Sequence, residues 1–192
     1  MFLEESLLAK RPNVIFVLAD DLGWAELGCY GNRFNETPNL DRLAKGGMRF
    51  TNAYASAPVC SPYRAAFLTG QYPARVGILD YLRPNSENAL SPDHLTLPEM
   101  FRDAGYATGM IGKWHLKMEP AAFDFYSVLP GQGKFHDPEF RVQGDKPWPK
   151  NVVIHKGEHS SDAITDSTLH WFKTQYDKDK PFFICHQFKA PH

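Results

Sequence analysis

The residues best placed to do chemistry begin with Cys60 and Arg64, which lie close together in the chain. Between and after them, Ser61 is suited to cap a helix, Pro62 to occupy its first position and Gly70 to end it. Cys60 would then lie at a helix N-terminus, where unpaired N–H groups and a partial positive charge favour an anion. Arg64 follows one turn later on the same face and adds a fixed cation. A potential nucleophile and two sources of positive charge therefore share one helical turn, although a small buried thiol is also a common structural residue.

Asp20 and Asp21 follow an apolar run, residues 13–19, which is typical of a strand buried on both faces of a parallel sheet. Open α/β sheets place their ligand sites at the carboxyl ends of such strands. The repulsion between two adjacent carboxylates there is best relieved by a hard cation. The alternative is a solvated turn, in which aspartate is also common.

Lys113 and His115 follow a second apolar run, residues 106–111, and one residue separates them. If the extended backbone continues, both side chains point to the same side. A lysine there could hold an oxyanion, and a histidine could exchange a proton near neutral pH. Alternatively, Lys113 is a solvated charge at the rim and His115 a hydrogen-bonded loop residue.

Four stretches of the chain resemble the type I sulfatases, which belong to the alkaline phosphatase superfamily. They are Cys60 to Arg64, which matches the Cys-x-Pro-x-Arg signature, Leu18 to Gly23, Gly112 to Leu116, and Ala190 to His192. In that family the cysteine is oxidised after translation to formylglycine, whose hydrated aldehyde is the nucleophile. The resemblance implies that Cys60 is this residue. It also implies a partner that performs the oxidation, a formylglycine-generating enzyme or an anaerobic sulfatase-maturating enzyme.

The same resemblance implies a cofactor and roles for the remaining residues. One calcium ion would be bound by Asp20 and Asp21, with the modified Cys60 among its contacts. Arg64 and Lys113 would stabilise the sulfate oxygens. Two further residues complete the implied catalytic set: His115, which would position the hydrate or help expel sulfate, and His192, which would protonate the departing alcohol.

The elements that must position these residues predict an α/β fold. A mostly parallel sheet contains residues 13–19, 106–111 and 182–188, with helices on both faces and the site at the carboxyl ends of the strands. Turn, capping and periodicity signals predict helices over residues 37–47, 96–105 and 160–176, and an edge strand over residues 48–54. Residues 120–149 are rich in proline, glycine and aromatic side chains and predict an ordered insertion over the site. Carbohydrate recognition and plain loop packing are both open for that insertion.

Composition excludes several classes of protein. The 192 residues are 43% hydrophobic and 22% charged, which is ordinary for a globular domain, and the formal net charge of −1 argues against a generally basic nucleic-acid binder. No apolar run approaches the roughly 20 residues that span a bilayer, so no membrane span is expected.

The acidic first eight residues do not match a signal peptide. Sulfatases are usually exported to the periplasm, the lysosome or the extracellular space, so the compartment stays open.

The resemblance covers the whole chain but less than half of a typical sulfatase. It implies that residues 1–192 are the N-terminal part of a sulfatase catalytic domain, without the remaining calcium ligands, a further sulfate-binding lysine and the C-terminal subdomain. The expected activity is hydrolysis of sulfate monoesters, on small molecules or, more specifically, on sulfated glycans. Two alternatives remain: a phosphonate or phosphodiester hydrolase of the same superfamily, and a catalytically inactive fragment.

Overall fold

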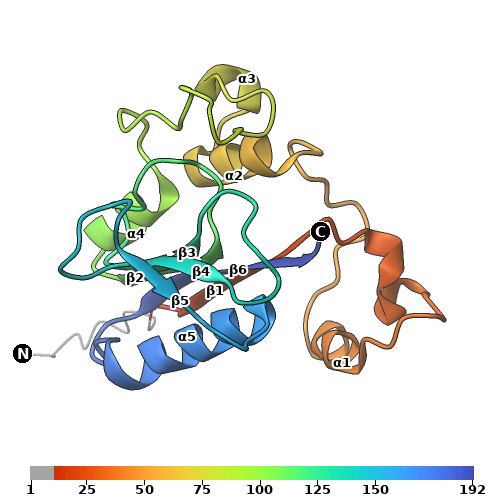
Figure 1. The fold of residues 1–192 in the computed structure, drawn as a ribbon. Coiled ribbons are helices and arrows are strands. Elements are labelled where there is room, and N and C mark those ends of the chain that lie inside the picture. The colour runs from red at the N-terminus through yellow and green to blue at the C-terminus, as the bar shows by residue number, and fades with distance from the viewer. Residues whose placement is uncertain (1–10) are drawn as a thin grey trace, which may run out of the picture.

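The structure is a computed structural model that describes residues 11–192, so the acidic opening segment lies outside the described residues. Its centre is a six-stranded sheet with the order β1-β6-β2-β3-β4-β5 (Figure 1). The first four strands in this order run parallel to one another, β4 is antiparallel to β3, and β5 is antiparallel to β4. The strands are β1 (Val14–Asp20), β2 (Ala107–Lys113), β3 (Phe125–Leu129), β4 (Glu139–Val142), β5 (Val152–Ile154) and β6 (Phe182–Pro191). The predicted α/β class is confirmed, and the three predicted core strands are adjacent as β1, β6 and β2.

Helices cover both faces of the sheet (Figure 1). One face carries α2 (Cys60–Thr69) and α4 (Leu97–Asp103), with α3 (Pro73–Val76) packed against α2, and the other face carries α5 (Ser160–Thr174). Helix α1 (Pro38–Gly46) lies to one side of these layers with two short 3₁₀ helices, η1 (Trp24–Glu26) and η2 (Gly28–Tyr30). Among residues 11–192, none of the helices has both the length and the apolar character that a membrane crossing requires.

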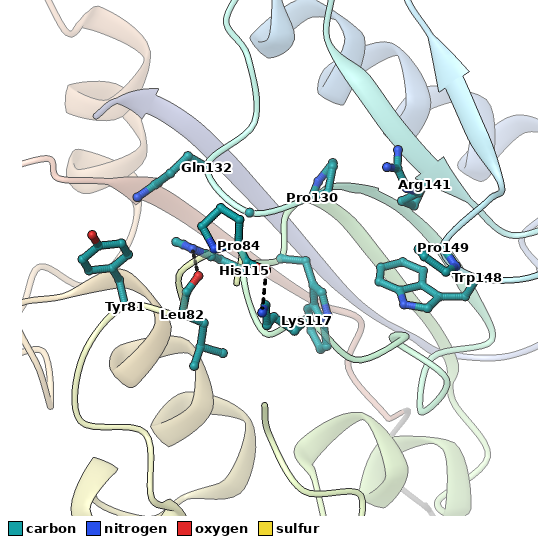
Figure 2. A pocket seen from close by; sticks show the side chains of 12 residues that line it. Tyr81, Leu82, Pro84, His115, Lys117, Pro130, Gln132, Arg141, Trp148 and Pro149 are labelled. Carbon is teal, nitrogen blue, oxygen red and sulfur yellow. Dashed lines mark hydrogen bonds between the residues drawn. The ribbon is translucent and has the colours of Figure 1, made fainter. Parts of the chain in front are cut away.

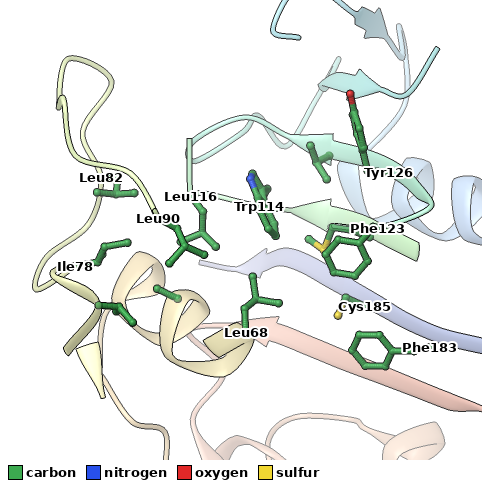
Figure 3. Packing of buried hydrophobic residues seen from close by; sticks show 14 of the residues in the cluster. Leu68, Ile78, Leu82, Leu90, Trp114, Leu116, Phe123, Tyr126, Phe183 and Cys185 are labelled. Atoms are coloured by element: carbon green, nitrogen blue, oxygen red, sulfur yellow. The ribbon is translucent and has the colours of Figure 1, made fainter. Parts of the chain in front are cut away.

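Each face of the sheet has its own apolar core. Leu68 of α2 packs with Met110 and Phe183 of the sheet on one side (Figure 3), and Trp171 of α5 packs with Ile184 on the other. Because β6 and β2 contribute to both cores, these two strands are held rigidly at the middle of the molecule. Their carboxyl ends are therefore well-fixed positions for functional side chains.

Strand β1 is less buried than its sequence predicts. Ile15 and Val17 are 54% and 57% exposed, although the apolar run predicted burial on both faces. The reason is the position of β1 at the edge of the sheet, since α5 packs against β6 and β2. The opposite face of β1 does reach the core, where Phe16 stacks on Phe67 at a ring separation of 3.9 Å.

One of the two predictions for the segment before α2 is wrong. Helix α1 forms where expected, with Leu40 and Leu43 exposed, and a polar contact anchors it: Asp41 Oδ1 accepts a 2.6 Å hydrogen bond from the Cys29 backbone N–H. Residues 48–54 form no strand and run as irregular chain. The apolar side chains in that stretch, such as Met48, therefore lie at the surface rather than against the sheet.

The segment of residues 120–149 is only partly an insertion. Residues 125–129 and 139–142 join the sheet as β3 and β4, so the loops that can overlie the site are shorter than predicted. The predicted capping box that starts α4 is confirmed, since the Thr96 backbone N–H donates to Glu99 Oε2 at 2.7 Å. Helix α5 buries Ile164, Thr168 and Trp171 as its periodicity indicates.

Candidate active site

Cys60 lies at the start of α2, although the helix begins earlier than predicted. Its N-cap is Val59, so Pro62 falls within the first turn and Ser61 does not cap the helix. Instead, Ser61 Oγ donates to the His115 carbonyl at 2.9 Å and accepts from the Leu82 N–H at 3.1 Å. Both of these contacts are buried, so they stabilise the serine side chain in this position rather than at the helix cap. They also connect the start of α2 to the loop that follows β2.

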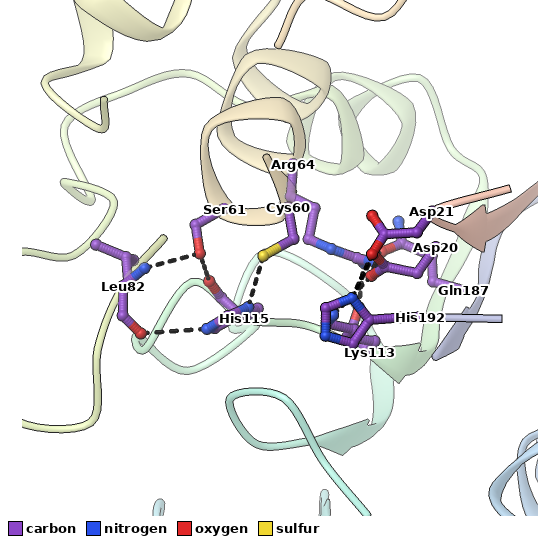
Figure 4. A network of polar contacts seen from close by, with 10 residues as sticks. All are labelled: Asp20, Asp21, Cys60, Ser61, Arg64, Leu82, Lys113, His115, Gln187 and His192. Carbon is purple, nitrogen blue, oxygen red and sulfur yellow. Dashed lines mark hydrogen bonds and ion pairs between the residues drawn. The ribbon is translucent and has the colours of Figure 1, made fainter. Parts of the chain in front are cut away.

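His115 faces Cys60 with an unprotonated nitrogen (Figure 4). Its Nδ1 lies 3.1 Å from Cys60 Sγ, and its Nε2 lies 3.1 Å from the Leu82 carbonyl oxygen. Because a carbonyl can only accept, Nε2 carries the ring proton and Nδ1 presents its lone pair to Cys60. Burial, together with the Lys113 charge, lowers the pKa of His115 to about 4, so the ring is neutral at neutral pH. His115 is therefore arranged as a proton acceptor for the group at position 60.

Asp20, Arg64 and Lys113 form a buried ionic cluster. Asp20 Oδ2 lies 2.7 Å from Arg64 Nη2 and 2.8 Å from Lys113 Nζ. The three residues are 6%, 2% and 0% exposed. Burial by itself raises the pKa of Asp20, but the hydrogen bonds and charges of Lys113 and Arg64 outweigh it and lower the pKa. Asp20 is thus held as a carboxylate between two cations.

Arg64 also fixes the framework of the site. It donates to the Lys113 carbonyl and to Gln187 Oε1 as well as to Asp20, so one side chain links α2 to β1, β2 and β6. Burial lowers the pKa of Arg64, and the adjacent Asp20 carboxylate opposes that effect. Both terminal nitrogens donate to protein acceptors, whereas Nε is buried without a hydrogen-bond partner among residues 11–192. Arg64 therefore acts on a bound anion mainly through its charge and through the positions it imposes on its neighbours.

The cluster carries one uncompensated positive charge. Two buried cations face one buried carboxylate, and the N-terminus of α2 adds a partial positive charge beside them. A cavity of about 270 Å³ opens next to the cluster, between the end of β1 and the start of α2, and is lined by Asp20, Asp21, Cys60 and Arg64. Because an unbalanced buried charge is costly, this cavity favours an anionic ligand.

Asp21 lines the same cavity, and His192 lies beside Asp21 (Figure 4). His192 Nδ1 is 2.5 Å from Asp21 Oδ2 and 3.9 Å from Asp20 Oδ1. Ligand atoms of Asp20, Asp21 and His192 all lie within 4.8 Å of one another, and Cys60 is not part of this group. Two carboxylates suit a hard cation such as calcium, which takes about six to eight oxygen ligands. Asp20 can offer Oδ1, since Oδ2 is occupied by Arg64 and Lys113.

The structure brings all seven sequence-predicted residues to this end of the sheet, and it adds two that the sequence analysis missed. Gln187 accepts from Arg64, and Lys189 is 6% exposed with Nζ 4.3 Å from the centre of the Phe135 ring. Burial and the Lys113 charge lower the pKa of Lys189. In the sequence, Gln187 and Lys189 are two polar residues in an otherwise largely apolar strand. Because they are two positions apart, their side chains lie on the same face of the sheet.

The fold therefore brings four features together at one end of the sheet: a cysteine at a helix N-terminus, a neutral histidine beside it, buried cations and a pair of carboxylates. A family model described as Sulfatase matches residues 12–192. The N-acetylglucosamine-6-O-sulfatase of Bacteroides thetaiotaomicron is 39% identical over 186 residues, which is 95% of this chain and 31% of the relative. Human arylsulfatase A is 45% identical over 130 residues, which is 67% of this chain and 25% of the relative.

A solved structure gives the same result. BT4656, in complex with its substrate D-glucosamine-2-N,6-O-disulfate, superposes with a TM-score of 0.84 and 38% sequence identity, covering 95% of this chain and 35% of BT4656. The chain belongs to the sulfatase family. It spans between a quarter and about a third of the length of these relatives.

Proposed function

We propose that the protein hydrolyses sulfate monoesters on carbohydrates. The observation that carries this proposal is the buried Asp20–Arg64–Lys113 cluster, whose excess positive charge lies beside Cys60 at a helix N-terminus. A sulfate monoester carries the negative charge that this cluster lacks. Membership of the sulfatase family supports the same reaction.

Cys60 is the proposed position of the nucleophile. The residue is a free, partly exposed cysteine at the edge of the cavity, which is where a formylglycine made from it would meet the substrate. As a hydrate, a formylglycine at position 60 would supply one hydroxyl as the nucleophile for sulfur, with the alcohol as leaving group. Deprotonation of its second hydroxyl would then expel sulfate and restore the aldehyde, which water hydrates again. His115 Nδ1 is placed to accept the proton from the attacking hydroxyl, because its lone pair already faces position 60.

The sulfate oxygens are held by charge on this chain. Lys113 and Arg64 supply the buried positive field, and the N–H groups at the start of α2 add donors. Asp20 and Asp21 are the proposed ligands of one calcium ion, which would add a further positive charge beside the sulfate oxygens. Asp21 orients His192 through Nδ1, so Nε2 is the nitrogen that would donate a proton to the departing alcohol.

The proposed substrates are sulfated amino sugars within glycans. Two relatives support this choice, the N-acetylglucosamine-6-O-sulfatase of Bacteroides thetaiotaomicron and the N-acetylgalactosamine-6-sulfatase of Rattus norvegicus, which is 34% identical over 213 residues. BT4656, bound to a disulfated glucosamine, also supports it. The proposed protein partner is the enzyme that oxidises Cys60.

The proposal is tested by mass spectrometry and by turnover. After co-expression with a formylglycine-generating enzyme, the peptide that contains Cys60 should lose about 18 Da relative to the thiol form. The protein should then release nitrophenol from 4-nitrophenyl sulfate faster than from bis(4-nitrophenyl) phosphate, and Cys60→Ala should abolish that release. Cys29→Ala is the matched control and should retain it.

Three results would overturn the proposal. The first is an unmodified thiol at position 60 in a host that modifies other sulfatases. The second is turnover that survives in Cys60→Ala. The third is a preference for the phosphate diester, which would favour the phosphodiesterase alternative.

A further inference from the structure

A second cavity adjoins the site across His115 (Figure 2). Its volume is about 510 Å³, which falls in the range of roughly 300–1,000 Å³ that is usual for small-molecule sites. His115 belongs to both sites: its Nδ1 faces Cys60, and the residue is part of the lining of this cavity. The other residues that matter to its chemistry are Tyr81, Lys117, Gln132, Arg141 and Trp148.

Two buried polar atoms in the cavity wall have no hydrogen-bond partner within residues 11–192. They are Arg141 Nη1 and Gln132 Oε1, a donor and an acceptor. Arg141 projects from β4, where its backbone pairs with Val128, and Gln132 lies in the loop after β3. Buried polar atoms are usually satisfied, so two of them in one cavity indicate a ligand that would accept from Arg141 and donate to Gln132.

The cavity lining is positively charged. Arg141 and Lys117 are among its residues, and no aspartate or glutamate is. Lys117 Nζ donates to the carbonyl oxygens of Pro84, at 2.9 Å, and Ser86, so neutral groups hold it and its charge is not cancelled. His115 is neutral at neutral pH and adds no charge of its own. An anionic group is therefore favoured here.

The lining is also aromatic. Trp148 is fixed by an edge contact with Tyr126 at a ring separation of 6.0 Å, and it lines the Arg141 end of the cavity. Tyr81 lies at the other end, 6.5 Å from the His115 ring. Flat, partly exposed rings flanked by a few polar groups suit a sugar ring, whose faces are apolar and whose edges carry hydroxyls.

We propose that this cavity binds an acidic sugar unit. Arg141 holds the anionic group of that sugar, Gln132 accepts a hydroxyl hydrogen, and Trp148 packs against the ring. The inference rests on the proposed function for the neighbouring sugar, which carries the sulfate ester at Cys60. The preferred substrates are then glycans in which an acidic unit lies next to the sulfated one.

Monosaccharide probes without a sulfate ester test the cavity independently of hydrolysis. Methyl β-D-glucuronide carries a carboxylate, N-sulfoglucosamine carries an N-sulfate, and methyl β-D-glucoside carries no charge. Binding is followed by the NMR shift of the Trp148 indole N–H, assigned with Trp148→Phe. At least one acidic probe should bind roughly tenfold more tightly than the glucoside, because a hydrogen bond to a charged group is worth about that much. The probe that does so identifies the anionic group.

Variants locate the interaction. Arg141→Met should remove the preference for the acidic probe and Arg141→Lys should keep part of it, whereas Arg42→Met on the exposed face of α1 should leave it unchanged. Gln132→Ala gives a second measurement if Arg141→Met does not fold, and it should weaken the binding of all three sugar probes.

Equal binding of charged and neutral probes would overturn the proposal. So would a preference that survives Arg141→Met or that inorganic sulfate abolishes by competition. Loss of turnover in Cys60→Ala with unchanged glucuronide binding would separate this cavity from the hydrolytic site.

Discussion

Asp20 and Asp21 are neighbours in sequence, but their environments differ sharply. Asp20 compensates two buried cations, whereas Asp21 is exposed and pairs with His192. Asp20→Asn leaves Arg64 and Lys113 buried without a counter-charge, so we expect a loss of about 3–5 kcal/mol in the free energy of unfolding. Asp21→Asn should cost less than about 1 kcal/mol, because exposed ion pairs contribute little.

Urea unfolding of the two variants at neutral pH measures this difference, and the unmodified chain suffices for it. Both variants should lose hydrolytic activity if both aspartates bind calcium. Equal stability of the two would contradict the charge balance described for the buried cluster.

His115 should make the stability of the protein depend on pH. Its pKa is about 4 in the folded protein and near 6.5 when unfolded, so the unfolded chain binds more protons between those values. Stability from the neutral ring is complete above pH 6.5 and is lost as the pH falls toward 4. We expect wild type to lose about 2 kcal/mol more than His115→Asn between pH 7 and 4.5.

The comparison of the two proteins isolates this histidine. Burial also lowers the pKa of His186, but that residue is present in both proteins and its effect cancels in the difference. Urea midpoints at the two pH values give the result. Parallel pH profiles for wild type and variant would show that the His115 ring is not buried in its neutral form.

Strand β2 reaches the site because Gly112 allows β6 to lie unusually close. A Cβ at this position would lie 1.8 Å from the Gln187 carbonyl oxygen, and its φ of 106° is one that other residues rarely adopt. Gly112→Ala must therefore separate the two strands just where Lys113 and Gln187 meet Arg64. We expect a loss of about 3 kcal/mol or more.

Gly144→Ala is the matched control, since a Cβ there meets nothing within 4 Å and its φ is ordinary. Thermal melting of both variants measures the effect. A Gly112→Ala protein that melts like wild type would show that the two strands can move apart without cost.

The protein should respond to calcium if Asp20 and Asp21 bind it. A ligand that binds only the folded state at about 100 times its dissociation constant adds about 2.7 kcal/mol. For a chain of this size, that raises the melting temperature by roughly 5–10 °C. Asp21→Asn should fold normally and lose most of this response. A melting temperature that ignores calcium would contradict the assignment of these two carboxylates as ligands of this chain.

Much of this molecule could be predicted from local sequence signals. Apolar runs indicated β1, β2 and β6, the capping box indicated α4, and the periodicity indicated α5, because each signal depends on neighbouring residues only. Short motifs indicated which residues carry the chemistry, and the carboxyl-end rule for parallel strands predicted that Asp20 and Lys113 would meet. The family resemblance supplied the significance of Cys60.

Tertiary structure decided the partners of those residues. The sequence does not reveal that Arg64 would donate to Asp20, Gln187 and the Lys113 carbonyl, since these acceptors come from three different strands. Nor does it reveal that Ser61 would bond to His115 rather than cap its helix. The burial of a side chain also depends on segments that are distant in the sequence. Ile15 and Leu43 have apolar side chains but are exposed, because no neighbouring element within residues 11–192 covers them. Residue type and spacing determined the possible chemistry, and the packing of distant segments fixed the distances, the charge balance and the protonation state on which that chemistry depends.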